Sequence, residues 1–140
     1  MARLVAQQLT RDAGQGANFL FEAAGTHALS KGEAMDPRAR SVLAKHHYAV
    51  DSTRSRRVSA DDFERFDWVL AMDKSNHSDL EKLCPAHLLS KLQLLLDYAP
   101  AQEVREVPDP YFGNVAGFER VLYLCELAVE GFLKKHSVVG

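Results

Sequence analysis

The residues best suited to chemistry lie near the C-terminus, where an aspartate stands between two prolines. The segment from Val107 to Gly113 reads Val-Pro-Asp-Pro-Tyr-Phe-Gly, so two aromatic residues follow close behind Asp109. A carboxylic acid in a loop stiffened by prolines can donate a proton to a leaving group. Tyr111 and Phe112 can form a wall against which an aromatic ring stacks. Taken alone, a Pro-Asp-Pro segment is more typical of an ordinary turn.

The sequence contains no cysteine placed to act as the nucleophile for such an acid. The Pro-Asp-Pro segment resembles the general-acid loop of a phosphatase, and this resemblance implies a nucleophilic cysteine followed six residues later by an arginine that helps to bind the phosphoryl group. Position 90, six after Cys84, is Ser90, and position 131, six after Cys125, is Gly131. We interpret Cys84 as a structural or solvent-facing thiol, and Cys125 as a core residue of a helix. The sequence therefore predicts a candidate general acid without the cysteine nucleophile that it would serve.

Composition narrows the class of protein. The chain has 140 residues, of which 46% are hydrophobic, so residues 1–140 are predicted to form a single domain. Its 17 basic and 19 acidic residues are interspersed, which argues against nucleic acid as a partner. Two widely spaced cysteines predict neither a disulfide framework nor a zinc site, and no two histidines lie four residues apart on a predicted helix. We expect no metal and no cofactor.

The location is predicted from what the sequence lacks. No run of about 18 apolar residues is present, so no membrane segment is expected. The first residues include Arg3 and Gln7-Gln8 and do not resemble the apolar core of a signal peptide. A reducing cytoplasm is the expected compartment.

Helical periodicity and short apolar runs alternate along the chain. Helices are predicted at the N-terminus up to Gly14, from Asp36-Pro37 to about His47, around Phe63 and Phe66, from Asp73 to about Leu83 and from about Val115 to Lys135. Strands are predicted at Phe19 to Ala24, Trp68 to Met72 and Leu92 to Leu96. This alternation predicts an α/β fold of three layers, with a parallel sheet flanked by helices on both sides.

Several residues support these boundaries. Asp36 is a candidate N-cap before a proline, Ser59 to Asp62 resembles a capping box, and Pro85 prevents a preceding helix from continuing. Trp68 is expected to pack in the core with Phe63 and Phe66. The last helix is the clearest, because one face collects seven apolar residues: Phe118, Val121, Leu122, Cys125, Ala128, Val129 and Phe132.

Three motifs in this order resemble the low-molecular-weight protein tyrosine phosphatases, from Met1 to about His136. The first motif combines Ala24 to Ala28 with Met35 to Ala39, the second is Ala71 to Asn76, and the third is Asp109 to Gly113. Met1-Ala2-Arg3 is similar to the point just past the phosphate loop of that family, C-x-x-x-x-x-R-S-P. The family's first strand and phosphate loop are not in this chain.

The resemblance implies phosphotyrosine hydrolysis through a cysteinyl-phosphate. Asp109 takes the position of the general acid, Tyr111 and Phe112 that of the substrate-binding wall, and Leu29 aligns with an aromatic residue that commonly lines the cleft. Without the loop there is neither a nucleophile nor an anion site, so we expect the chain as given to be inactive. A phosphotyrosine protein or a small aryl phosphate would be a substrate only if the loop were restored.

The matching residues also depart from the family pattern. Ala23 stands where the family usually has a serine, and Thr53 where it has a histidine, both of which support the phosphate loop. Arg56 matches a family arginine, although a solvated basic turn explains it equally well. Arsenate reductases share this fold, but they need the same loop and a nearby pair of resolving cysteines. The changes at Ala23 and Thr53 weigh modestly toward degeneration of the site.

Two functions of different classes remain open. The first is a phosphatase whose N-terminus, as given, omits the catalytic loop. The second is a pseudophosphatase that acts as an interaction or assembly protein. In the family the first strand lies between the strands matched by Phe19 to Ala24 and Trp68 to Met72. Its absence would leave two sheet edges, which we expect to be covered by direct pairing of these strands or by self-association.

Overall fold

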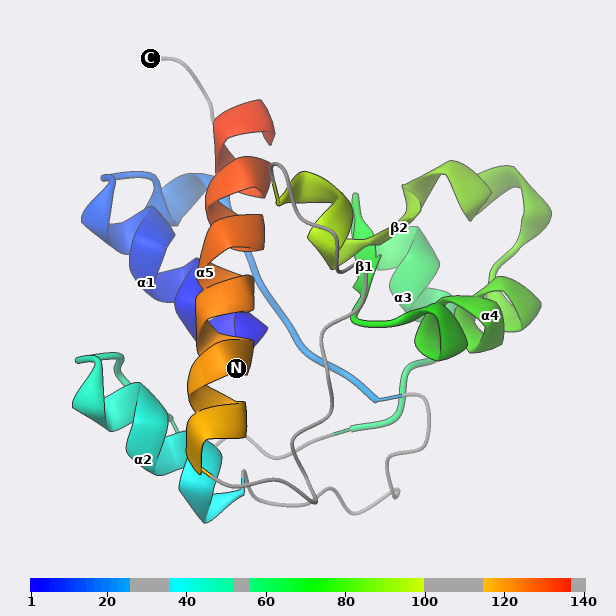
Figure 1. Ribbon diagram of the computed structural model, residues 1–140. Helices are drawn as coiled ribbons and strands as arrows, with labels where there is room; N and C mark the ends of the chain where they lie inside the picture. Colours follow the sequence, from blue (N-terminus) through cyan, green and yellow to red (C-terminus); the bar gives the residue numbers. More distant parts are fainter. Residues whose placement is uncertain (26–35, 52–55, 100–114, 137–140) are drawn as a thin grey trace.

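Two short parallel strands separate two groups of helices (Figure 1). The computed structural model describes residues 1–25, 36–51, 56–99 and 115–136. The α-helices are α1 (Ala2–Asp12), α2 (Pro37–Lys45), α3 (Ala60–Arg65), α4 (Lys74–Leu83) and α5 (Val115–His136). The strands are β1 (Val69–Ala71) and β2 (Leu92–Leu94), and the short 3-10 helices are η1 (Gly16–Asn18), η2 (Ala86–Lys91) and η3 (Leu95–Tyr98). Within the described residues, no helix is both long and apolar enough to cross a membrane.

The strand pair lies between two hydrophobic clusters. Val69, Leu70 and Ala71 pair in register with Leu92, Gln93 and Leu94. Alternate side chains of a strand point to opposite faces of a sheet. Leu70 and Met72 accordingly pack against the cluster formed with α1, α2 and α5, and Val69 and Ala71 join the cluster formed with α3 and α4. The predicted parallel sheet with helices on both faces is confirmed for these strands.

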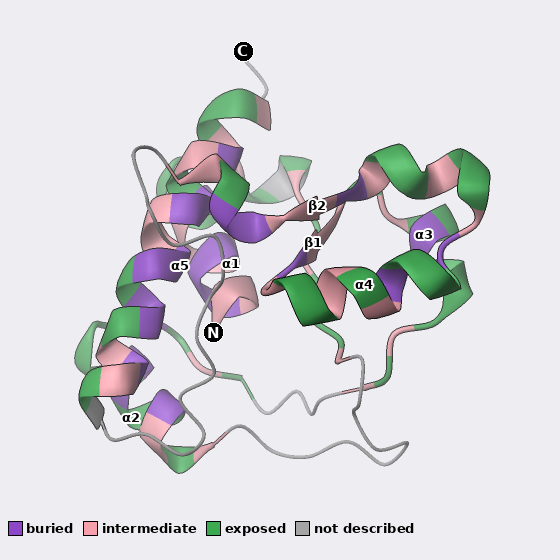
Figure 2. Cartoon of the chain, turned by 45° about the vertical axis from the view of Figure 1, so that its right-hand side comes forward, coloured by how far each residue is buried: buried purple, intermediate pink, exposed green. Residues whose placement is uncertain are grey.

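The larger cluster is built around α5. Figure 2 shows the buried surface of this helix turned toward α1 and α2, with green, exposed residues on its outer side. All seven apolar residues that the sequence placed on one face of this helix are buried. Leu124, which lies off that predicted face, is fully buried as well, because α1, α2 and η3 all contact α5 and cover a wider arc of its surface.

Helix starts follow the capping residues that the sequence predicts. The carboxylate of Asp36 accepts the backbone N–H of Arg38 at 2.8 Å, and Pro37 takes the first helical position of α2. Asp73 caps α4 by accepting the N–H of Asn76 at 2.6 Å. Ser59 and Asp62 form the predicted capping box of α3. Side chains therefore satisfy amide groups that a helix leaves unpaired at its N-terminus.

The predicted strand from Phe19 to Ala24 does not form. Phe19 has extended dihedral angles, yet no backbone hydrogen bond joins the segment to another described residue before Gly25. Leu20 keeps 74% of its surface exposed. The segment does not pair with β1 either, so direct pairing, one of the two alternatives expected for these sheet edges, is wrong. An extended segment becomes a strand only when a neighbouring backbone accepts its hydrogen bonds, and the described residues supply none here.

Two other predictions need correction. Trp68 does not pack in the core: its side chain is 38% exposed and its ring lies 4.8 Å from that of His136, the last residue of α5. Phe63 is fully buried as predicted, whereas Phe66 is half-buried. The strand predicted up to Leu96 ends at Leu94, because the chain turns into η3 and buries its next two leucines against α5.

Candidate functional site

The residues predicted for catalysis and substrate binding belong to two segments that lie outside the described residues. Asp109, Tyr111 and Phe112 fall within 100–114, and Leu29 falls within 26–35. Thr53, one of the two departures from the family pattern, is also outside. The structure does, however, describe the elements from which these segments start and to which they return. Their roles stay predictions, and the geometry that can be described is that of the flanking framework.

The carboxyl ends of the parallel strands mark the edge of the sheet where sites in α/β proteins usually lie. β1 ends at Ala71 and leads through Met72 to Asp73, while β2 ends at Leu94. The carboxylate of Asp73 is already used as the cap of α4. The second family motif, Ala71 to Asn76, therefore has a structural explanation, since it ends a buried strand and begins a helix.

The segment that contains Leu29 starts from a fixed point. The N–H of Gly25 donates to the carbonyl of Arg56 at 2.8 Å, and the N–H of Val58 donates to the carbonyl of Gly25 at 3.1 Å. Gly25 and Arg57 thus form a parallel bridge between two distant parts of the chain. This bridge holds Gly25, the last described residue before the segment, in place.

The bridge is reinforced by an ion-pair network that sequence reasoning missed. Arg56 donates to both carboxylate oxygens of Asp62 at 2.9 Å and to Glu22 at 3.2 Å. Asp62 also accepts the backbone N–H of Ser59 at 2.9 Å, and its side chain is only 6% exposed. Arg56 is therefore an ion-pair residue and not a solvated basic turn. No sequence signal would have found the pairing, because the spacing of residues 22, 56 and 62 matches no local pattern.

The electrostatics of Asp62 follow from this arrangement. Burial acts to raise the pKa of its carboxyl group, because the charged form loses solvent. The hydrogen bonds from Arg56 and from the backbone of Ser59 stabilise the carboxylate and outweigh burial, so the pKa is lowered. Asp62 is consequently a charged anchor and not a proton donor.

Both cysteines are held in the thiol form. The thiol of Cys84 is buried and donates to the carbonyl of Pro85 at 3.3 Å, and burial raises its pKa. Cys125 is almost completely buried, and burial raises its pKa to about 11. Nucleophilic cysteines instead have lowered pKa values and an electropositive setting. Burial confirms the core position predicted for Cys125, and for Cys84 it favours the structural alternative over the solvent-facing one.

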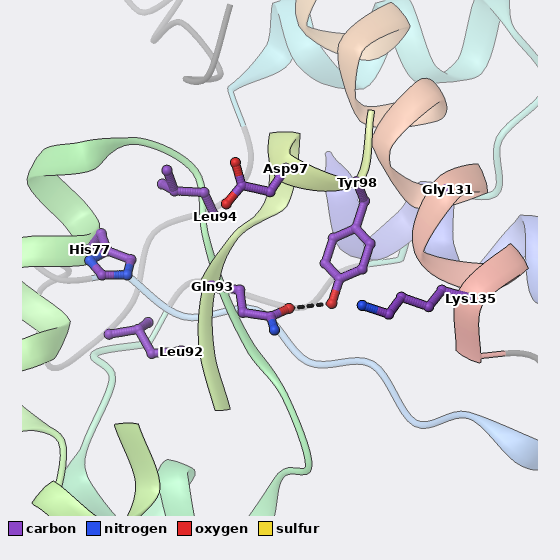
Figure 3. Close-up of a pocket in the computed structure, with 8 residues that line it drawn as sticks. All are labelled: His77, Leu92, Gln93, Leu94, Asp97, Tyr98, Gly131 and Lys135. Carbon is purple, nitrogen blue, oxygen red and sulfur yellow. Dashed lines mark hydrogen bonds between the residues drawn. The ribbon is translucent and has the colours of Figure 1, made fainter. Parts of the chain in front are cut away.

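The described residues also line an open cavity of about 440 Å³ beside β2 (Figure 3). In Figure 3 Tyr98 donates a hydrogen bond to the side chain of Gln93, and Lys135 and His77 lie on opposite sides of this pair. The remaining described residues of its lining are Leu92, Leu94, Asp97 and Gly131. This part of the lining contains neither a cysteine nor an arginine, so it offers no nucleophile with an anion-binding guanidinium.

The comparisons with known proteins agree with this framework. Residues 1–138 match the family model described as low molecular weight phosphotyrosine protein phosphatase. A low molecular weight protein-tyrosine-phosphatase of Streptomyces coelicolor is 38% identical over 136 residues, which are 95% of this chain and 82% of that protein. The low molecular weight phosphotyrosine protein phosphatase of Sus scrofa is 33% identical and is covered to 85%, with 96% of this chain aligned.

Solved structures extend the likeness to the fold. A protein tyrosine phosphatase from Entamoeba histolytica, crystallised with Hepes in its active site, superimposes with a TM-score of 0.91 at 33% identity. The superposition covers 96% of this chain and 85% of that one. The parallel strands, the helix layers and the order of motifs thus define an α/β protein of the phosphatase type. The chain belongs to the low molecular weight phosphotyrosine protein phosphatase family.

Proposed function

We propose that this chain carries the proton-donating half of a site that hydrolyses phosphotyrosine. Asp109 protonates the leaving tyrosyl oxygen, and Tyr111 and Phe112 form the wall beside the tyrosyl ring. Leu29 lines the same cleft, where its aliphatic side chain gives a weaker stacking surface. The observation that supports this proposal is the family match over residues 1–138, which includes all four positions.

The other half of the chemistry requires groups that the 140 residues do not contain. A thiolate must attack phosphorus, while backbone N–H groups and an arginine hold the phosphoryl oxygens. Neither cysteine is followed by an arginine at the required spacing, and burial raises the pKa of both thiols. We therefore propose that the 140-residue chain lacks the first strand and phosphate loop, and that alone it is inactive.

A second candidate function is that of a pseudophosphatase used for interaction or assembly. The observation that favours it is the exposed segment from Phe19 to Ala24, whose backbone has no partner among the described residues. The coding sequence upstream of Met1 separates the two candidates. An in-frame C-x-x-x-x-x-R-S-P stretch there would favour the enzyme, and its absence the pseudophosphatase.

The first experiment measures hydrolysis of an aryl phosphate by the purified 140-residue chain. We expect no activity above the blank, because residues that act together in catalysis fail together when one part is missing. The matched variant is Cys84→Ser, which removes the more accessible of the two thiols. Activity that exceeds the blank and disappears in Cys84→Ser would contradict the proposal.

A second experiment tests the general acid directly. The missing strand and loop of a family member are joined to Met1, and Asp109→Asn is compared with the grafted parent. We expect kcat to fall by roughly 100-fold or more for a poor leaving group, and by less as the leaving group becomes more acidic. Asp61→Asn, a change of an exposed aspartate in α3, is the control and should leave kcat unchanged.

The outcome that would reject the role of Asp109 is equally clear. If an active graft and its Asp109→Asn variant have equal kcat values across leaving groups of different acidity, the segment is only a turn. In the ungrafted chain the same substitution should change the free energy of unfolding by less than about 0.5 kcal/mol, because the role proposed for Asp109 is catalytic and not structural.

A further inference from the structure

Two segments that carry predicted site residues return to the described framework at neighbouring points. The segment 26–35, which contains Leu29, leads into α2, and the segment 100–114, which contains Asp109, leads into α5. The first turns of these two helices lie side by side at the lower end of Figure 1. A contact between the two helix starts therefore bears on both segments.

Arg38 makes such a contact. Its guanidinium carbon lies over the ring of Phe118, 4.8 Å from the ring centre. Phe118 belongs to the first turn of α5 and is only 4% exposed, and the side chain of Arg38 is 36% exposed. A cation held over an aromatic face is attracted by the ring, and more strongly where water is partly excluded. Arg38 thus fastens the start of α2 to the start of α5.

Asp36 fixes the direction of this guanidinium. The Nε of Arg38 donates to one carboxylate oxygen of Asp36 at 3.2 Å, and its Nη2 donates to the other at 2.9 Å. The hydrogen bonds from the side chain and the backbone of Arg38 lower the pKa of Asp36, so its carboxylate is charged at neutral pH. A planar guanidinium can pair along its edge and stack on its face at the same time. Arg38 therefore joins Asp36, the first described residue after the segment 26–35, to the ring of Phe118.

The segment 26–35 is also held where it begins. Gly25, the residue before it, pairs with Arg57 in the parallel bridge. The segment thus runs between two held points, and Arg38 ties the second of them to α5. A shift at that point would move the segment relative to the residues that precede α5.

We propose that Arg38 is a positioning residue, which fixes the separation between the two sides of the proposed cleft. Leu29 belongs to one side, and Tyr111 and Phe112 belong to the other. This inference rests on the proposed function and deepens it, since Arg38 takes no part in proton transfer. A cleft of fixed width binds an aromatic ring without first having to be ordered. Loss of Arg38 should therefore weaken substrate binding and raise KM, while kcat, which depends on Asp109, stays close to that of the parent.

The first test is limited digestion of the 140-residue chain with trypsin, which cleaves after Lys31 in one segment and after Arg105 in the other. We expect Arg38→Gln to raise both cleavage rates by about fivefold, because the two helix starts are no longer held together. Cleavage after Lys82 in α4 is the internal reference and should keep its rate. The matched control is Arg40→Gln, an exposed position of the same helix, which should change none of the three rates.

The second test uses the chain grafted with the missing strand and loop. We expect Arg38→Gln to raise KM for an aryl phosphate by about fivefold or more and to change kcat by less than about twofold. Arg38→Lys should restore part of the loss, because an ammonium group can lie over the Phe118 ring but cannot form the two-pronged pair with Asp36. Arg40→Gln should leave both constants unchanged.

Two outcomes would overturn the positioning role. One is an equal rise in cleavage at all three sites, because a general loss of stability would then explain the effect. The other is an active graft in which Arg38→Gln leaves KM unchanged. Failure of the proposed function gives different results: if Asp109→Asn leaves kcat unchanged while Arg38→Gln still raises KM, the acid role falls and the positioning role stands. An inactive graft would likewise count against the proposed function alone, because the digestion is measured in the 140-residue chain.

Discussion

Helix α5 and the segment from Phe19 to Ala24 are both rich in apolar residues, yet one is buried and the other is not. Every apolar residue predicted on one face of α5 is buried, whereas Leu20 is largely exposed. A helix forms most of its hydrogen bonds within itself and needs only a cover for one face. A strand needs a neighbouring backbone as well. Local sequence can therefore specify the helix. For a strand it specifies the apolar residues but not the neighbouring backbone that accepts its hydrogen bonds.

The largest effect that tests this comparison comes from the core of α5. Leu122→Ala removes a buried side chain from the contact between α5 and its neighbouring helices, and should lower the free energy of unfolding by about 3 kcal/mol. Tyr123→Ala, the adjacent and exposed position, is the control and should change it by less than about 1 kcal/mol. Urea unfolding followed by circular dichroism measures both. Equal losses of unfolding free energy in the two variants would show that burial is not confined to one side of α5.

A smaller effect is expected where α5 meets η3. A Cβ atom at Gly131 would lie 1.9 Å from the carbonyl oxygen of Tyr98, so Gly131→Ala must push two backbones apart. We expect a loss of about 2 kcal/mol, even though alanine favours helices more than glycine does. Gly16→Ala, where the nearest atom lies at an ordinary 3.7 Å, is the control. A stabilised Gly131→Ala variant in urea unfolding would show that this approach is not tight.

The ion pair between Arg56 and Asp62, beside the end of the extended segment, should contribute less to the free energy of unfolding than the core of α5, and its contribution should depend on pH. Arg56→Gln removes the two hydrogen-bonded contacts of Arg56 with the buried carboxylate of Asp62 and leaves only Arg65, 4.0 Å away, so it should cost about 1–2 kcal/mol near neutral pH, a modest value because the side chain of Arg56 is 39% exposed. Arg57→Gln, an exposed neighbour on the same segment, should have little effect. Hydrogen exchange of the Gly25 amide should also become faster in Arg56→Gln.

The sign of the pH dependence follows from the lowered pKa of Asp62. Its ordinary value is 3.8, and the folded protein holds it lower, so the carboxylate contributes stability above 3.8. That contribution declines as the pH falls through 3.8 and is lost below the folded-state pKa. The difference between the parent chain and Arg56→Gln in urea unfolding should therefore shrink in acid. A difference that stays constant with pH would rule out the ion pair as its cause.

The smallest effect is predicted at the exposed segment itself. Leu20→Ala should change the free energy of unfolding by less than about 0.5 kcal/mol in urea unfolding, because the side chain of an exposed residue loses little on truncation. A loss of unfolding free energy as large as that of Leu122→Ala would contradict the difference between the exposed segment and the core of α5.

Much of the fold could be predicted because its signals are local. Asp36 and Asp73 cap helices within three residues of their own positions, and the apolar period of α5 identifies its buried face. The end of β2 was misjudged because Leu95 and Leu96 are apolar and buried in either conformation, so hydrophobicity alone does not separate strand from 3-10 helix. The exposure of Trp68 depends on where the end of α5 lies, which no local pattern records.

The site could be predicted only as motifs. The order of three motifs identified the family, and the family comparison confirmed it. The positions of Asp109, Tyr111, Phe112 and Leu29 stay predictions, because they lie outside the described residues. The link between Arg56 and Asp62 was missed for a physical reason. Asp62 was understood as a capping residue alone, although a carboxylate has enough lone pairs to serve a helix cap and a guanidinium together.

The position of Trp68 against His136 makes tryptophan fluorescence a probe of the C-terminal end of α5. Trp68 is the single tryptophan, so the fluorescence of the protein comes chiefly from one site, where the start of β1 meets the end of α5. Burial and the nearby Lys135 lower the pKa of His136 below 6.5. Neutral imidazole quenches indole emission less than imidazolium does, so emission should stay bright through mildly acidic pH and dim only below that. Release of the helix end should instead shift the emission toward the red.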